Sequence, residues 1–273
     1  MGEGCCGGSR PPKEPFPTTL LRTKDEADGI KTFSFSGHLC GAPGQFIMLW
    51  LPGVNERPFS IYQDNHDSFS ITVSKVGGFT EALFSAKKGA SFCFTGPHGN
   101  PFSLSGKRIA LVGGGYGAAP LTWLAKAAAV QGIKSDLIIG ARSKNLILYR
   151  SERYPGEVTR HYCTDDGSFG EKGMITDVLR RLLEKGGIDM VYTVGPELMM
   201  KAVVDLTDKF KVGCQISLER YMKCGCGICG SCSVDPLGIR MCVEGPCIDK
   251  SLAKKITEFG VYHRDASGKK TFF

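Results

Sequence analysis

The 273-residue sequence has no long block of lysine and arginine and no uninterrupted apolar stretch long enough to cross a membrane. Its net charge of +7 is spread along the chain in groups no longer than pairs such as Lys87-Lys88, so we expect no nucleic-acid-binding surface. The most apolar window, residues 109–130, contains three consecutive glycines, Pro120 and Lys126, which argue against a spanning helix. Residues 1–10 lack the apolar core of a signal peptide. These absences predict a cytoplasmic protein with no membrane anchor.

Cysteine, in contrast, is abundant. Six of the 12 cysteines lie within residues 224–247, interleaved with glycine and without histidine. A chain of this length, with 42% hydrophobic residues, needs no disulfides for stability, so the thiols point to metal binding in a reducing compartment. Cys224, Cys229 and Cys232 have C-x4-C-x2-C spacing, with Cys242 further on. This is the plant-type ferredoxin spacing, in which four thiolates hold a [2Fe–2S] cluster.

Two other metal sites remain possible. A [4Fe–4S] cluster could use Cys226, Cys229 and Cys232, although the next position of that motif falls at Pro236. A structural zinc site usually has two separated short cysteine pairs, whereas these thiols crowd into one loop. We favour the [2Fe–2S] cluster, in which Cys226 competes with Cys224 for one ligand position.

The first third of the chain alternates between short apolar-polar segments and turns, which predicts an antiparallel β-barrel over residues 15–105. Strands are expected at residues 18–24, 30–36, 45–51, 60–63, 68–76 and 91–95, and one helix at residues 80–87.

Two motifs of this region could bind a phosphorylated heterocycle. Arg57-Pro58-Phe59-Ser60 combines a guanidinium suited to a pyrophosphate with a hydroxyl and an aromatic ring. Gly77-Gly78-Phe79-Thr80 stands at a strand-to-helix junction, where free N–H groups favour a phosphate. Each motif alone could instead be a surface turn or an ordinary helix cap.

From about residue 106 the pattern changes to alternating strands and helices, which predicts a parallel sheet with its ligand at the carboxyl ends of the strands. A strand at 108–112, the loop Gly113-Gly114-Gly115-Tyr116-Gly117 and a helix that contains Pro120 in its first turn form a nucleotide-binding arrangement. Strands at 136–140, 157–163 and 190–194 and helices at 175–185 and 197–209 follow, with Gly195-Pro196 opening the last helix.

Together these motifs resemble the ferredoxin–NADP reductase superfamily. The resemblance implies an FAD-binding barrel with Arg57, Pro58, Phe59, Ser60, Gly77, Gly78 and Thr80 at the flavin. It implies a nicotinamide-nucleotide domain with Gly113, Gly114, Gly115, Gly117, Pro120, Gly195 and Pro196 at its site. Gly96-Pro97-His98-Gly99 resembles the loop that closes the family's barrel, with His98 a loop residue rather than a catalyst. The cysteine that precedes Gly-Pro in many members is Val194 here.

One branch of the superfamily resembles the chain most, from about Pro17 to Asp249: the electron-transfer subunit of NAD-dependent dihydroorotate dehydrogenase. Its Leu-Glu-Arg and Cys-Gly motifs map onto residues 218–232, and its later Cys-x-x-Gly-Pro onto residues 242–246. This mapping gives Cys224, Cys229, Cys232 and Cys242 as ligands, whereas Cys226 and Cys247 depart from the family. Glu219 and Arg220 are expected to pair and orient the cluster loop.

The resemblance implies an α+β multidomain oxidoreductase subunit with FAD, a [2Fe–2S] cluster and NAD, and with no catalytic general base. NAD is favoured over NADP, chiefly through the family. The expected partner is an FMN-containing dihydroorotate dehydrogenase catalytic subunit, in a two-plus-two heterotetramer of pyrimidine (UMP) biosynthesis. Alternatives are a subunit of a hydrogenase, sulfite reductase or ferredoxin transhydrogenase, and a non-enzymatic metal-binding module. We expect a leader at 1–14, the FAD barrel at 15–105, the NAD domain at 106–213, a cluster segment at 214–250 and a tail without assigned role at 251–273.

Overall fold

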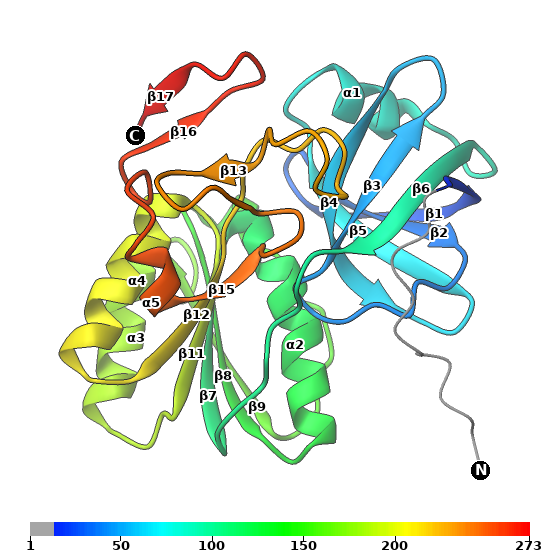
Figure 1. Cartoon of the computed structure of the whole chain (residues 1–273). Helices are drawn as coiled ribbons and strands as arrows, with labels where there is room; N and C mark the ends of the chain where they lie inside the picture. The colour runs from blue at the N-terminus through cyan, green and yellow to red at the C-terminus, as the bar shows by residue number, and fades with distance from the viewer. Residues whose placement is uncertain (1–13) are drawn as a thin grey trace, which may run out of the picture.

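The computed structural model describes residues 14–273, so most of the flexible leader expected at residues 1–14 lies outside the described residues. The described chain folds into a barrel and a seven-stranded sheet, and the cysteine-rich segment lies where the two meet (Figure 1). Within this range, no helix is both long and apolar enough to cross a bilayer. The predicted α+β class is confirmed.

The barrel closes through six antiparallel strands in the order β1-β2-β5-β4-β3-β6. Side chains along a strand point alternately to its two faces. Those that point into the barrel are completely buried, among them Phe33, Phe35, Phe69 and Ile71. The expected strand at 60–63 is longer than predicted, because Arg57 to Ser60 also pair with β3 instead of forming a turn. The elements are β1 (Phe16–Ala27), β2 (Ile30–Ser36), β3 (Phe46–Leu51), β4 (Asn55–Asp64), β5 (Ser68–Ser74), α1 (Gly78–Ser85) and β6 (Ser91–His98).

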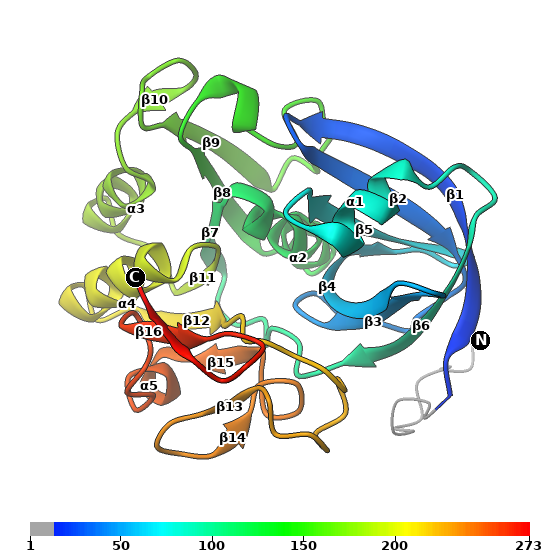
Figure 2. The same ribbon diagram turned by 90° about the horizontal axis from the view of Figure 1, so that it is seen from above.

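The sheet has the order β10-β9-β8-β7-β11-β12-β15 and is parallel except for β15. Helix α2 lies between the sheet and the barrel, and α3 and α4 cover the other face (Figure 2). The strands are β7 (Arg108–Gly114), β8 (Lys134–Ala141), β9 (Val158–Thr164), β10 (Glu171–Lys172), β11 (Met190–Val194), β12 (Gly213–Ser217) and β15 (Cys247–Asp249); the helices are α2 (Ala118–Val130), α3 (Ile175–Glu184) and α4 (Glu197–Lys209). Short 3-10 turns occupy Gly115–Gly117 and Lys144–Leu146.

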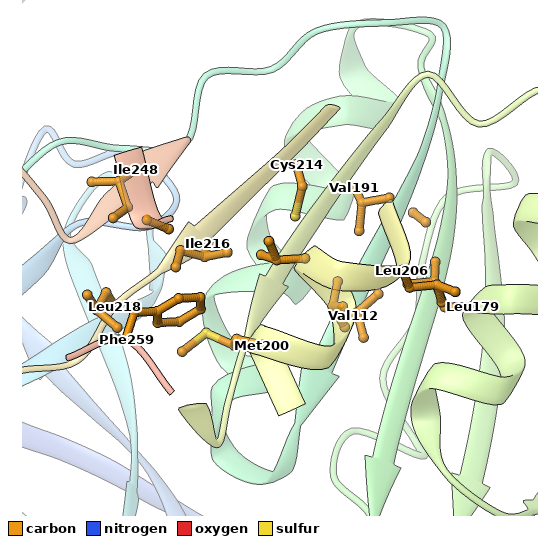
Figure 3. Packing of buried hydrophobic residues seen from close by; sticks show 14 of the residues in the cluster. Val112, Leu179, Val191, Met200, Leu206, Cys214, Ile216, Leu218, Ile248 and Phe259 are labelled. Carbon is orange, nitrogen blue, oxygen red and sulfur yellow. The ribbon is translucent and has the colours of Figure 1, made fainter. Parts of the chain in front are cut away.

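The last 60 residues contain structure that the sequence pattern did not reveal. The cluster segment includes the β13–β14 hairpin (Ser233–Val234 and Ile239–Arg240), and β15 joins the sheet beside β12, across the domain boundary expected near residue 213. After α5 (Lys250–Ala253), the tail forms a second hairpin of β16 (Tyr262–Arg264) and β17 (Lys270–Phe272). Phe259 of the tail packs in the core near Leu218 and Met200 (Figure 3).

Gly44 allows the barrel to approach β15 closely, and its replacement should destabilise the protein. Its φ is +98°, and an added Cβ would lie 2.4 Å from the Cys247 sulfur. We expect Gly44→Ala to lower the free energy of unfolding by about 3 kcal/mol, since backbone strain and overpacking add. Gly29→Ala is the control: φ there is +68° with nothing within 4 Å, so only about 1 kcal/mol of strain applies. Urea denaturation followed by circular dichroism measures both; equal losses would contradict the proposed clash.

Candidate functional site

A cavity of about 230 Å³ lies where the barrel, the sheet and the cluster segment meet. The barrel contributes a mixed polar and aromatic wall, the glycine loop and β11 contribute backbone and apolar groups, and the cluster segment closes the cavity. Its lining includes Pro58, Phe59, Ser60 and Thr80 of the barrel, Gly117, Pro120 and Val194 of the sheet, and Met222 and Pro246 of the cluster segment. Residues of both nucleotide-binding motifs therefore face one space.

Thr80 fixes the junction that leads into α1. Its hydroxyl accepts hydrogen bonds from the N–H groups of Val76 (2.9 Å) and Gly77 (3.0 Å) and donates to the Gly77 carbonyl (2.8 Å). The predicted residues Gly77 and Gly78 thus shape the turn but do not line the cavity. Arg57 does not line it either, and its guanidinium donates to the Glu56 carbonyl at 2.8 Å.

A second cavity, of about 600 Å³, lies over the carboxyl ends of β7 and β11. Gly114 and Gly115 line it from the glycine loop, and Gly195 and Pro196 line it from the loop that leads into α4. The two loops touch, because a Cβ on Gly117 would lie within 2.8 Å of Gly195 backbone atoms. This volume suits a cofactor-sized ligand, and helix N-termini beside glycine-rich backbone favour phosphate groups.

Gly113 serves a different purpose. It lines neither cavity, and a Cβ at this position would lie 2.7 Å from the Cα of Ala118. The glycine therefore permits β7 to pack closely against the start of α2.

Tyr116, Glu219 and Arg220 line both cavities and mark where these spaces meet. Although Glu219 remains exposed to solvent, the protein atoms close to its carboxyl limit hydration and raise its pKa, and Glu197 raises it further. Glu219 and then burial raise the pKa of Tyr116 to about 12, so this phenol stays protonated at neutral pH. The sequence did not identify Tyr116 as a lining residue. It also did not place Glu219 at the edge of the sheet, because β12 was not predicted.

Arg220 does not pair with the Glu219 carboxylate, and that prediction was wrong. Its guanidinium binds Glu197 at 2.7 and 3.2 Å and Glu258 at 2.5 Å, and only the main-chain carbonyl of Glu219 accepts from it. Neighbouring residues of an extended chain point in opposite directions, which separates these two side chains. Arg220, Glu197 and Glu258 are all buried.

The cysteine-rich loop arranges four thiols in two neighbouring pairs. The N–H of Cys229 points to the Cys224 sulfur at 3.5 Å, and the N–H of Cys242 points to the Cys232 sulfur at 3.4 Å. Burial would raise the pKa of Cys224, but main-chain N–H groups, that of Cys229 foremost, lower it to about 6. An interaction with the Cys242 thiol is the main cause that lowers the pKa of Cys232 to about 7.

Two pairs of thiols match a cluster with two irons, each of which takes two protein ligands. The arrangement therefore fits a [2Fe–2S] group better than one zinc ion.

The two remaining cysteines of the segment occupy different surroundings. Cys226 is exposed, and its thiol contacts that of Cys224. Cys247 is buried in β15 and donates to the Gly44 carbonyl at 3.6 Å, so it belongs to the contact with the barrel. The loop itself packs on the barrel, since a Cβ on Gly225 would meet Met48 and His98.

The barrel, the nucleotide-binding sheet and the cavities between them define a reductase of the ferredoxin–NADP reductase type. Residues 111–205 match the family model of the oxidoreductase NAD-binding domain. Residues 219–252 match that of the iron-sulfur cluster binding domain of dihydroorotate dehydrogenase B. Among solved structures, a chain of the NADH-dependent reduced ferredoxin–NADP oxidoreductase superimposes with a TM-score of 0.79 at 28% identity, over 88% of this chain and 89% of that one. Phthalate dioxygenase reductase shares the fold (TM-score 0.59, 20% identity, over 71% of this chain and 64% of that one).

Curated relatives narrow the class to one family. A probable dihydroorotate dehydrogenase B (NAD+) electron transfer subunit of Methanocaldococcus jannaschii is 42% identical over 249 residues, which is 91% of this chain and 95% of the relative. The corresponding protein of Pyrococcus horikoshii is 43% identical over 252 residues, 92% of this chain and 96% of the relative. The chain belongs to the family of dihydroorotate dehydrogenase B (NAD+) electron transfer subunits, as its motifs predicted.

Proposed function

We propose that the chain carries electrons from an FMN-containing, dihydroorotate-oxidising subunit to NAD+ in pyrimidine (UMP) biosynthesis, within a cytoplasmic two-plus-two heterotetramer. The observation that carries this proposal is the cavity at the meeting of barrel, sheet and cluster segment. Met222 and Pro246 connect this cavity to the cysteine loop, and Tyr116, Glu219 and Arg220 connect it to the second cavity. The chain would thus hold NAD, FAD and the [2Fe–2S] cluster next to one another in that order.

We assign FAD to the smaller cavity and NAD to the larger one. Phe59 supplies an apolar face and Ser60 a hydroxyl at the flavin, while Thr80 lines the same cavity and its hydroxyl fixes the turn at Gly77. Gly114, Gly115 and Gly195 let nucleotide phosphates approach the backbone. Cys224, Cys229, Cys232 and Cys242 are the cluster ligands.

When bound, the nicotinamide and the flavin exchange a hydride, and the flavin and the cluster exchange single electrons. The chain itself positions these groups and excludes water between them. Val194, which is buried at the end of β11, presents methyl groups to the flavin cavity where many members of the superfamily present a thiol. The side chain at position 194 therefore offers no hydrogen-bond donor, whereas Ser60 brings a hydroxyl to the same cavity from the barrel.

A second function is favoured by the likeness to the NADH-dependent reduced ferredoxin–NADP oxidoreductase. In that case the same arrangement would serve a ferredoxin transhydrogenase, a hydrogenase or a sulfite reductase, and the partner would differ. The third possibility, a metal-binding module without redox function, requires that the chain purify without flavin.

The proposed function is tested by co-expressing the chain with its FMN-containing candidate partner and adding dihydroorotate under anaerobic conditions. We expect the cluster and both flavins to be reduced and NAD+ to yield NADH in a one-to-one ratio with orotate. The chain alone should oxidise NADH with an artificial electron acceptor but should not oxidise dihydroorotate. Copurification with a hydrogenase or sulfite reductase instead, or a colourless protein that holds zinc, would overturn the proposal.

A further inference from the structure

The C-terminal hairpin, β16–β17, is fixed to the body of the protein at several points. Arg264 forms an ion pair with Asp235 of the cluster segment at 2.5 Å, and the Tyr262 hydroxyl reaches the same carboxylate at 3.4 Å. The N–H of Gly260 donates to Glu197 at the start of α4 at 2.8 Å. The hairpin is therefore held beside both the cluster segment and the nucleotide-binding edge of the sheet.

Its position makes the hairpin one wall of the larger cavity. His263, Arg264, Asp265 and Phe273 line this cavity opposite the glycine loop and the Gly195-Pro196 loop. The rings of His263 and Phe273 lie 5.2 Å apart between centroids, so they form one aromatic surface. An aromatic surface facing phosphate-binding loops is suited to a heterocyclic base and its ribose.

The order of strands indicates which half of a dinucleotide lies there. The sheet runs β9-β8-β7-β11-β12, and the larger cavity covers the β7 and β11 ends. Tyr116, Glu219 and Arg220 join this cavity to the flavin cavity, so the redox-active ring must lie toward β11 and β12. A dinucleotide that crosses the glycine loop would place its adenosine half at the ends of β8 and β9, beside Arg142 and Thr164. The hairpin lines the larger cavity and would not contact that half.

We propose that the C-terminal hairpin is part of the nicotinamide-nucleotide site, where Phe273 and His263 contact the nicotinamide-ribose half of the cofactor. This inference rests on the proposed assignment of NAD to the larger cavity. The hairpin lies beyond residues 219–252, which match the cluster-binding family model, so it adds a recognition element to that unit. The hairpin contributes to the affinity for the nicotinamide half, whereas the adenosine half binds at the ends of β8 and β9.

Isothermal titration of the oxidised chain, loaded with flavin and iron, tests the proposal with NAD+ and with AMP as separate ligands. We expect Phe273→Ala to raise the Kd for NAD+ about 5- to 10-fold, because an aromatic contact with the ligand is lost, and to leave the Kd for AMP unchanged. His263→Ala should shift the Kd for NAD+ in the same direction.

Phe272→Ala is the matched control. Phe272 is the adjacent exposed phenylalanine, but it packs on Tyr262 (centroids 5.6 Å apart) and does not line the cavity, so both Kd values should change less than about twofold. Unchanged NAD+ affinity in both Phe273→Ala and His263→Ala, or an equal loss for AMP, would refute the hairpin's role. If the unaltered chain bound no NAD+, the proposed function itself would fail, which is a distinguishable result.

Discussion

Cys232→Ser should remove the cluster from the purified chain while leaving the flavin in place. Cys232 and Cys242 form the buried thiol pair, and a serine hydroxyl is a far poorer iron ligand than a thiolate. We expect iron to fall close to background and dihydroorotate-dependent NAD+ reduction to drop by about two orders of magnitude or more, because the single-electron route is broken. NADH oxidation by an artificial acceptor, which uses the flavin, should persist. Iron analysis, visible spectra and the two assays measure these effects.

Two cysteine variants serve as controls for this experiment. Cys226→Ser alters an exposed thiol in the same loop, and Cys247→Ala alters a buried thiol that contacts Gly44. Both should retain iron and the characteristic visible spectrum. If Cys226→Ser lost the cluster while Cys224→Ser kept it, the ligand assignment would have to change to Cys226.

Arg220→Ala should cause the largest loss of stability among single substitutions of charged residues in the described chain. Its side chain, 3% exposed, is shared by the buried carboxylates of Glu197 and Glu258, and one oxygen of Glu258 already lacks a partner. Removal of this guanidinium leaves two buried carboxylates without their ion-pair partner. We expect the free energy of unfolding to fall by about 3–5 kcal/mol.

The control for Arg220 is Arg240, whose ion pair with Glu244 is partly exposed, with side chains 40% and 36% accessible to solvent. Arg240→Ala should cost less than about 1 kcal/mol, because water already screens an exposed pair. Urea titration of both variants, with flavin and iron content checked beforehand, gives the comparison. A loss for Arg220→Ala no larger than that for Arg240→Ala would show that the buried network contributes little to stability.

The periodic spacing of apolar residues predicted the regular strands and helices well, because the buried face of each element follows its geometry. Residues 190–194 and 197–209 form β11 and α4 as expected, since each element packs one apolar face into the core. The family motifs likewise placed Pro58, Ser60 and Thr80 at one cavity, but Gly117 and Pro120, which the sequence assigned to the nicotinamide nucleotide, line that same cavity and not the larger one. Local patterns of this kind need no knowledge of distant contacts.

Features that depend on contacts between residues distant in the chain could not be predicted from the sequence. Arg220 and Glu219 are adjacent and opposite in charge, yet the partners of Arg220 are 23 and 38 residues away. Strand β15 is three residues long and is stabilised by pairing with β12, so its own sequence carries almost no periodic signal. The tail is polar and its sequence suggested no role, but Ile256 and Phe259 bury their side chains in the main core. Such contacts are set by tertiary packing and not by spacing along the chain.

The cluster segment is hydrogen-bonded to both halves of the molecule. Its strand β15 pairs with β12 of the sheet, while Asn100 of the barrel donates to the carbonyls of Gly245 (2.5 Å) and Glu244 (2.9 Å). A group that binds only the folded segment therefore also favours the docked arrangement of barrel and sheet, which is thermodynamic linkage. Binding of the cluster should therefore increase the affinity of the chain for its flavin and its nucleotide. Assembly of the metal centre is then also a step in the formation of the flavin site.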